Sequence, residues 1–229
     1  TRHSIKGIVN TEGYQIVFTD TPGVLKPHYK LQESMLKYSE TALTDADIIL
    51  YVTDIFESVE KNEEFLEKVK KVNVPILLVI NKIDLSDQDT INLYVDKWKK
   101  LLPQAEIFPS SALENFNVNN IFQRILELLP ECPPYFPKDQ LTDRSERFFV
   151  SEIIREKILK QYKKEIPYSV EVEVESFKDE NELIKIRAII YVERKSQKGI
   201  IIGHQGKAIK KVGTDAMKDI EGFFEKKVF

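Results

Sequence analysis

The chain has 229 residues, of which 42% are hydrophobic and 31% are charged, and its formal net charge is −3. Such a composition is typical of a soluble globular protein, and the length suits two domains better than one. The longest apolar run, at residues 74–80, is shorter than the roughly 18 residues that a membrane span needs. The single cysteine, Cys132, cannot form an internal disulfide, which indicates a reducing compartment. We therefore expect neither a membrane-spanning protein nor a disulfide-stabilised secreted domain.

The first 130 residues alternate between short apolar runs and amphipathic stretches. Strands are expected at residues 5–9, 14–20, 48–53, 75–80 and 107–108, and helices around residues 31–43, 65–72, 91–102 and 118–129. The first two strands are joined by Glu12-Gly13 and should form a hairpin. The third and fourth strands are apolar throughout, which predicts burial on both faces of a mostly parallel sheet covered by helices. This pattern predicts an α/β domain.

Residues 130–137 contain four prolines and read as a stiff linker. The pattern then changes to a helix at residues 148–164, an alternating strand at 168–177 and a partner strand at 183–192, with helices further on. This order predicts a small α+β domain. We therefore expect domains at residues 1–132 and 146–229, joined by a linker at 133–145.

A strand that ends at Asp20 runs directly into Thr21-Pro22-Gly23. A carboxylate at the end of a strand, followed by a glycine turn, is how phosphate-binding α/β folds present an acid to a magnesium ion. Gly23 has no β-carbon, so its N–H could approach a terminal phosphate closely. The alternative is a strand followed by an ordinary Thr-Pro-Gly turn.

Asn81-Lys82-Ile83-Asp84 follows the strand expected at residues 75–80. The Asp84 carboxylate could accept two hydrogen bonds from guanine, from its ring N–H and its amino group, whereas adenine presents an acceptor there. Asn81 would bridge neighbouring loops, and the stem of Lys82 would cover the base. The alternative is a strand that ends in a polar turn.

Ser111-Ala112-Leu113 follows the next expected strand, and its small residues would let backbone N–H groups reach a base carbonyl. Asp20, Asn81 and residues 110–111 all come at the carboxyl ends of expected strands, which is where α/β sheets bind ligands. Their shared position favours one ligand site over three unrelated turns.

The C-terminal region contains a second glycine motif, Gly203-His204-Gln205-Gly206, in a stretch without acidic residues between Glu193 and Asp215. Two glycines allow the backbone to turn against nucleotide phosphates, and nearby lysines add charge for the RNA backbone. The residues predicted to contact RNA are Lys198, Gly203, His204, Gln205, Gly206, Lys207, Lys210 and Lys211. The alternative is a glycine turn between two helices, with the lysines on a solvated face.

Taken together, the motifs at residues 20–23, 81–84 and 111–113 resemble those of translation-factor-related GTPases, and Thr1-Arg2-His3 resembles the end of switch I. Residues 201–210 resemble the G-x-x-G loop of a KH domain. Residues 143–148 and 151–157 resemble the junction of the bacterial Era GTPases. The resemblance covers essentially the whole chain. It implies a P-loop-type α/β GTPase domain followed by a small α+β KH domain of type II.

The same resemblance implies ligands, partners and a role. The nucleotide-binding residues would be Asp20, Thr21, Pro22, Gly23, Val24, Asn81, Lys82, Ile83, Asp84, Ser111, Ala112 and Leu113. GTP or GDP would bind with Mg²⁺ held by Thr1 and Asp20, and a monovalent cation could join them. The protein would bind the 3′ end of 16S rRNA and assist maturation of the small (30S) ribosomal subunit. It would be a cytoplasmic monomer that could associate peripherally with the inner membrane.

Two features depart from the pattern of this family. The family carries G-x-x-x-x-G-K-[ST] ahead of switch I, whereas the only Gly-Lys pair here is Gly206-Lys207. We therefore expect this chain to be an internal fragment that binds GTP poorly and hydrolyses it hardly at all. Val24 occupies the position where Ras-like switches have a water-orienting glutamine, so backbone groups, a cation or bound RNA would have to place the water. No catalytic base is assigned.

Two alternative functions remain open at this point. The first is an RNA-binding assembly factor whose degenerate nucleotide domain is a non-enzymatic scaffold. The second is a GTP-driven switch that acts on a protein partner, with the KH-like domain as an interaction module.

Overall fold

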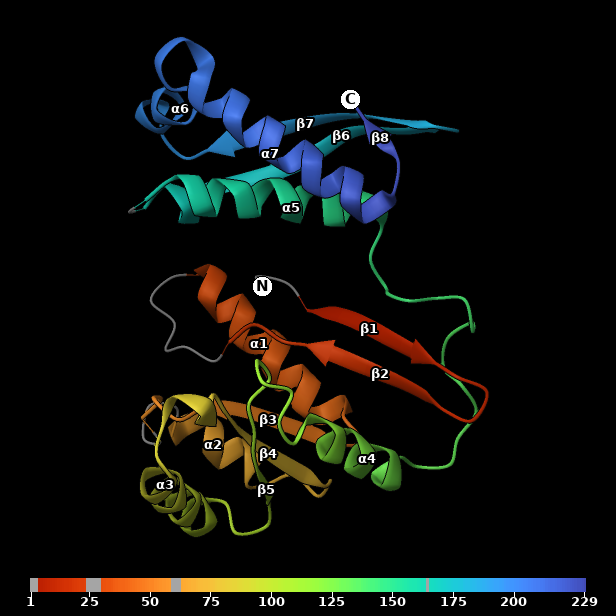
Figure 1. The fold of residues 1–229 in the computed structure, drawn as a ribbon, viewed down its shortest axis with the longest axis vertical. Helices are drawn as coiled ribbons and strands as arrows, with labels where there is room; N and C mark the ends of the chain where they lie inside the picture. Colours follow the sequence, from red (N-terminus) through yellow and green to blue (C-terminus); the bar gives the residue numbers. More distant parts are fainter. Residues whose placement is uncertain (1–3, 24–29, 59–62, 164) are drawn as a thin grey trace. The chain divides into compact units, whose positions relative to one another are not determined.

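The structure is a computed structural model that describes residues 4–23, 30–58, 63–163 and 165–229. The chain divides into two compact units, residues 1–143 and 144–229, and no sheet is shared between them. The elements of both units are labelled in Figure 1. No helix among the described residues is both long and apolar enough to cross a membrane.

The strands of the first unit form two sheets. β1 (Ile5–Asn10) and β2 (Gln15–Asp20) pair antiparallel, and this confirms the predicted hairpin. β3 (Ile49–Asp54), β4 (Ile76–Asn81) and β5 (Glu106–Pro109) form a parallel sheet with β4 at its centre. The carboxyl ends of these three strands therefore meet at one edge of the sheet.

Helices cover both faces of the parallel sheet (Figure 1). They are α1 (Lys30–Asp45), α2 (Glu63–Val69), α3 (Gln88–Leu101) and α4 (Val118–Leu128). Alternate residues of β4 point to opposite faces. Leu78 and its alternate neighbours pack with residues of α2 and α3, including Trp98. Leu77 and Val79 pack against α4 through Ile121 and Ile125. Because both faces of β4 are covered, all the apolar residues of its run at 76–80 are buried.

β3 differs from the prediction that both of its faces are buried. Ile49 lies in the core, but Leu50 is 39% exposed and Val52 is 58% exposed. The reason is the position of β3 at the edge of the three-stranded sheet, since α4 packs against Leu77 and Val79 of the neighbouring strand. An apolar strand sequence is therefore not enough to predict burial on both faces.

The segment that the sequence marks as a linker is attached to the hairpin over much of its length. The Gln15 side chain accepts hydrogen bonds from the backbone N–H groups of Tyr135 and Phe136 and donates one to the Phe136 carbonyl oxygen, at 2.8 to 3.0 Å. Further along, the N–H of Ile8 donates to the carbonyl oxygen of Leu141 at 2.8 Å. These bonds explain why residues up to 143 belong to the first unit.

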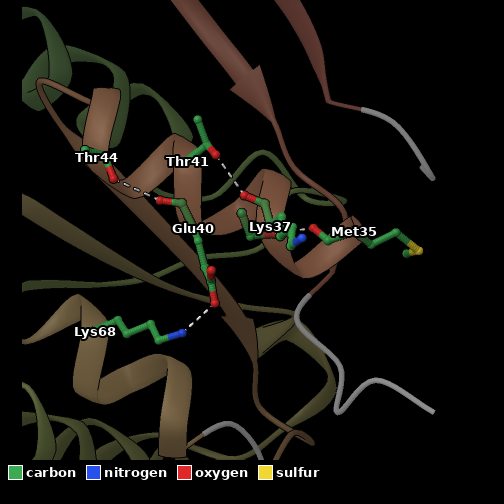
Figure 2. A network of polar contacts seen from close by, with 7 residues as sticks. Met35, Lys37, Glu40, Thr41, Thr44 and Lys68 are labelled. Atoms are coloured by element: carbon green, nitrogen blue, oxygen red, sulfur yellow. Dashed lines mark hydrogen bonds and ion pairs between the residues drawn. The ribbon is translucent and has the colours of Figure 1, made fainter. Parts of the chain in front are cut away.

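Helix α1 makes polar contacts along its length and with its neighbour α2 (Figure 2). The hydroxyls of Thr41 and Thr44 donate to the backbone oxygens of Lys37 and Glu40, one turn earlier. The Glu40 carboxylate forms an ion pair with Lys68 of α2 at 2.5 Å. An exposed pair of this kind contributes about 1 kcal/mol at most. The contact therefore adds little to the stability of the unit.

The second unit is a three-stranded sheet packed with helices. α5 (Glu146–Gln161) precedes β6 (Val170–Glu180) and β7 (Leu183–Val192). α6 (Lys195–Ile202), α7 (Lys207–Phe224) and β8 (Lys227–Val228) follow them. β7 lies at the centre, antiparallel to β6 and parallel to β8. The predicted order of helix, two strands and two helices is confirmed.

Alternation in β6 determines which face of this sheet the helices cover. Val170, Val172 and Val174 are buried, whereas the intervening glutamates are exposed. The valines pack with residues of the helices, among them Ile158 of α5 and Val212 of α7. The half-buried strand expected from the sequence is therefore the one observed.

Replacement of Leu77 by alanine tests the role of β4. Leu77 is fully buried, so the change should lower the free energy of unfolding by about 2–5 kcal/mol, which is typical of a buried cavity. Urea unfolding can be followed through the fluorescence of Trp98, the single tryptophan, which is buried in the same unit. Leu93→Ala on the exposed face of α3 is the matched control and should change stability by no more than about 0.5 kcal/mol. Equal effects of both changes would contradict the double-sided burial of β4.

Candidate functional site

The loops at the carboxyl edge of the parallel sheet are joined by backbone hydrogen bonds. The N–H of Ile55 donates to the carbonyl oxygen of Asn81 at 3.2 Å. On the other side of β4, the N–H of Ser110 donates to the carbonyl oxygen of Ile80 at 2.8 Å, and that of Ile83 donates to the Ser110 carbonyl oxygen at 3.3 Å. These bonds hold the three loops in fixed positions relative to one another.

Asn81 connects its own loop to the one after β5. Its side-chain oxygen accepts a hydrogen bond from the N–H of Ala112 at 3.0 Å. Two of the predicted motifs, at residues 81–84 and 111–113, are thus in direct contact. In this structure the Ala112 N–H is engaged by the protein itself rather than left for a base carbonyl.

The loop after β5 is closed by its own serines. Ser110 and Ser111 are both buried, and the Ser110 hydroxyl donates to the carbonyl oxygen of Phe116 at 2.9 Å. Ser111 exchanges backbone hydrogen bonds with Phe116 and accepts one from the Glu114 N–H on its hydroxyl. Leu113 is left 82% exposed at the tip. The serines therefore shape this loop from within, which their sequence pattern alone does not reveal.

Lys82 and Asp84 lie at the start of a short 3₁₀ turn, η2 (Ile83–Leu85). Lys82 has left-handed backbone angles, with φ 63° and ψ 30°, and Asp84 is exposed at the edge of the sheet. The Lys82 ammonium forms an ion pair with Asp54, the last residue of β3, at 2.6 Å. The hydrogen bond from Lys82 holds the pKa of the Asp54 carboxyl below its usual value. Asp54 is a member of this edge that the sequence analysis missed.

The Asp20–Gly23 segment begins at the carboxyl end of β2, where Asp20 lies opposite Ile5 in the hairpin. The buried Ser39 hydroxyl of α1 donates to the carbonyl oxygen of Pro22 at 3.0 Å and so fixes the turn to that helix. Among the described residues, no atom lies within 4 Å of where a β-carbon at Gly23 would be. The predicted residues Thr1 and Val24 lie outside the described residues.

The G-x-x-G loop joins α6 to α7 in a strained conformation. Gly203 and Gly206 have φ values of 70° and 73°, and Gln205 between them has φ 50°. A β-carbon on Gly203 would lie 2.5 Å from that of Ala208, whereas one on Gly206 would meet no described atom within 4 Å. Glycine at position 203 is therefore required by packing as well as by backbone angle.

Charged and hydrogen-bonding groups surround this loop. Lys198, Lys207, Lys210 and Lys211 are all exposed, as are His204 and Gln205. α7 begins at Lys207, so its first backbone N–H groups point toward the loop, a position that favours an anion.

Gln161 and Tyr162, at the end of α5, contact α7 and α6 on either side of the loop. The Gln161 side chain donates to the carbonyl oxygen of Ala208 at 2.8 Å, and the Tyr162 hydroxyl donates to that of Ile201 at 2.6 Å. The sequence analysis missed both residues because they are more than 35 positions away along the chain.

Comparison with known proteins identifies both units. The family profile described as "50S ribosome-binding GTPase" matches residues 1–82, and the profile of the KH domain matches residues 165–229. GTPase Era of Staphylococcus haemolyticus is 41% identical over all of this chain and 77% of its own length. GTPase Era of Clostridium kluyveri is 41% identical over all of this chain and 79% of its own length.

Two solved structures agree along the whole chain. One is the crystal structure of Era in complex with MgGDPNP and nucleotides 1506–1542 of 16S ribosomal RNA, with 33% identity and a TM-score of 0.93. The other is an Era variant from Aquifex aeolicus bound to GDP.AlF4−, with 33% identity and a TM-score of 0.92. Each match covers 100% of this chain and 79% of the chain compared.

A GTPase-type α/β unit followed by a KH unit defines a GTP-binding protein that also carries an RNA-binding module. The chain belongs to the Era family of GTPases, which are GTP-hydrolysing enzymes. The family and fold expected from the sequence are both confirmed.

The hydrogen bond between Asn81 and Ala112 can be tested without a ligand. Asn81→Ala removes the acceptor, so the backbone amides of residues 110–117 should exchange with deuterium faster, at least severalfold at Ala112. Hydrogen exchange followed by mass spectrometry measures this, and Asn81→Asp, which keeps an acceptor oxygen, should restore protection. Asn92→Ala on the exposed face of α3 is the control. Unchanged protection in Asn81→Ala would mean that the backbone bonds alone hold the loop.

Proposed function

We propose that this protein is a GTP-driven switch that binds the 3′ end of 16S rRNA through its KH unit and assists maturation of the 30S subunit. The observation that carries the proposal is the contact of Asn81 with Ala112, which brings the two predicted base-reading motifs together beside the exposed Asp84. The Era relative whose structure contains MgGDPNP and 16S rRNA nucleotides matches across both units. That full-length match favours the small subunit over the 50S subunit, which is named only in the profile for residues 1–82.

The residues at the sheet edge fit a guanine base. An exposed carboxylate at Asp84 can accept hydrogen bonds from the guanine ring N–H and amino group, and the Asn81 amide can donate from its nitrogen while its oxygen holds Ala112. Leu113 is exposed at the tip of the neighbouring loop and offers apolar surface. The other residues of the proposed nucleotide site, at positions 20–24, would face the phosphates.

Magnesium fits the end of β2 with few protein ligands. No group of three or more His, Cys, Asp or Glu side chains that could hold a metal ion occurs among the described residues. Mg²⁺ keeps several waters and binds through one or two protein groups plus substrate phosphates, and the exposed Asp20 at the carboxyl end of β2 offers one such group. Asp20 would supply the carboxylate and Thr1 a hydroxyl. When bound, Mg²⁺ would neutralise charge on the phosphates. A monovalent cation could add positive charge there and help to place the water, since the Val24 side chain has no group that could orient it.

Asp84→Asn tests the base-reading role. The amide keeps one acceptor but turns the other into a donor that faces the guanine amino group, so GDP affinity should fall about 10- to 100-fold. Xanthosine diphosphate has a carbonyl in place of that amino group, so it should bind the variant better than GDP does. Fluorescence titration of the protein at its natural length with GDP, XDP and ADP measures these preferences.

Asp96→Asn is the matched control, because Asp96 is an exposed carboxylate on α3 in the same unit. It should leave all three affinities unchanged. An Asp84→Asn variant with undiminished preference for GDP would reject the base-reading role, and absence of any guanine preference in the wild-type protein would favour the scaffold alternative.

The G-x-x-G loop fits a single-stranded RNA backbone. Its two glycines have positive φ, the first turn of α7 presents N–H groups, and the exposed lysines supply positive charge. Ile200 and Ile202 of α6 are partly exposed beside the loop, and apolar side chains of this kind can contact unstacked bases.

Lys207→Glu combined with Lys210→Glu tests this surface. The double variant should weaken binding of an oligonucleotide with the 3′-terminal sequence of 16S rRNA. It should also reduce the slope of log affinity against log salt by about 0.7 for each phosphate that the protein no longer neutralises. The control, Lys178→Glu with Lys218→Glu, makes the same change in net charge at exposed positions of the same unit. An unchanged slope in the first variant would move the RNA site elsewhere.

A further inference from the structure

Asp54 is fixed at the carboxyl end of β3, directly opposite Asn81 in the register of the parallel sheet. Both of its carboxylate oxygens are used. Oδ1 accepts a hydrogen bond from the N–H of Phe56 at 2.9 Å, and Oδ2 pairs with the Lys82 ammonium at 2.6 Å. The backbone around it is closed by a turn in which the N–H of Glu57 donates to the Asp54 carbonyl oxygen. The carboxylate is therefore held by the backbone on one side and holds a lysine on the other.

Lys82 is the more exposed partner of this pair. Its side chain is 52% exposed, against 26% for Asp54. A long lysine side chain loses conformational entropy when it is held in one position. Its left-handed backbone is unusual for a residue other than glycine and fixes the direction in which the side chain leaves the loop. The ion pair with Asp54 then fixes the position of the ammonium group at the end of that side chain.

The pair contributes little to folding. Partly exposed ion pairs add little to stability. This one joins two loops that backbone hydrogen bonds already connect, since the Ile55 N–H donates to the Asn81 carbonyl oxygen. The ion pair is better explained by an effect on ligand binding. A side chain that is held in place before the ligand arrives loses less entropy on binding.

We propose that Asp54 is a positioning residue of the guanine-nucleotide site, which holds Lys82 so that the lysine stem lies ready to cover the base. The inference rests on the proposed function of residues 81–84. Asp54 acts only through Lys82, so its effect on nucleotide binding depends on the presence of the ammonium.

A double-mutant cycle tests this dependence. Asp54→Asn removes the charge but keeps an oxygen for the Phe56 N–H, and Lys82→Met keeps the apolar stem but removes the ammonium. In the protein at its natural length, Asp54→Asn should weaken GDP binding about fivefold, which is within the range of coupling between contacting residues. In the Lys82→Met background the same change should have no further effect. Asp54→Glu, which keeps the carboxylate, should recover part of the loss.

Glu67→Gln is the matched control, since Glu67 forms an exposed ion pair of the same 2.6 Å length with Lys70 on α2. It should leave GDP affinity unchanged, and none of the variants should change urea unfolding appreciably. Unchanged GDP affinity in Asp54→Asn would overturn the inference, and so would a loss of equal size in both backgrounds.

Titration of wild-type protein and Asp84→Asn with GDP and ADP in the same series distinguishes failure of the proposed function from failure of this inference alone. Wild-type protein without a preference for GDP would overturn the proposed function together with this inference. A preference that Asp84→Asn abolishes but Asp54→Asn leaves intact would overturn the inference alone.

Discussion

The first unit depends on the burial of β4 on both faces. Leu78 and its alternate neighbours pack toward α2 and α3 while Leu77 and Val79 pack toward α4, so apolar packing holds the strand from both faces. Asn81 is the residue at which this strand ends. The packing of β4 therefore positions Asn81 and, through its hydrogen bond to Ala112, the next loop.

Structural features that depend on residues close together along the chain can be predicted from the sequence. Alternation in β6, the solid apolar run of β4 and the glycine motifs are local patterns, and they led to the correct fold class and family. The exposure of Leu50 and Val52 was not predicted, because it depends on which strand lies beside β3.

The same reasoning applies to the candidate sites. Asp54, Ser39, Gln161 and Tyr162 act across long sequence separations, and each is a common residue type without a motif of its own. The residues that would touch a ligand are therefore visible in the sequence, whereas those that hold them in place are visible only in the fold. Only an ion pair or hydrogen bond in three dimensions distinguishes Asp54 from other aspartates on the surface.

The packing of Gly203 against Ala208 makes the two glycines of the loop unequal under mutation. Any side chain at position 203 must displace the first turn of α7, so tolerance there depends on what occupies position 208, and the two positions should vary together among related sequences. Position 206 has open space, and a substitution there meets only the backbone penalty of about 1–2 kcal/mol. A substitution at position 203 should therefore report on folding, whereas one at position 206 should change the surface proposed to face RNA while the domain stays folded.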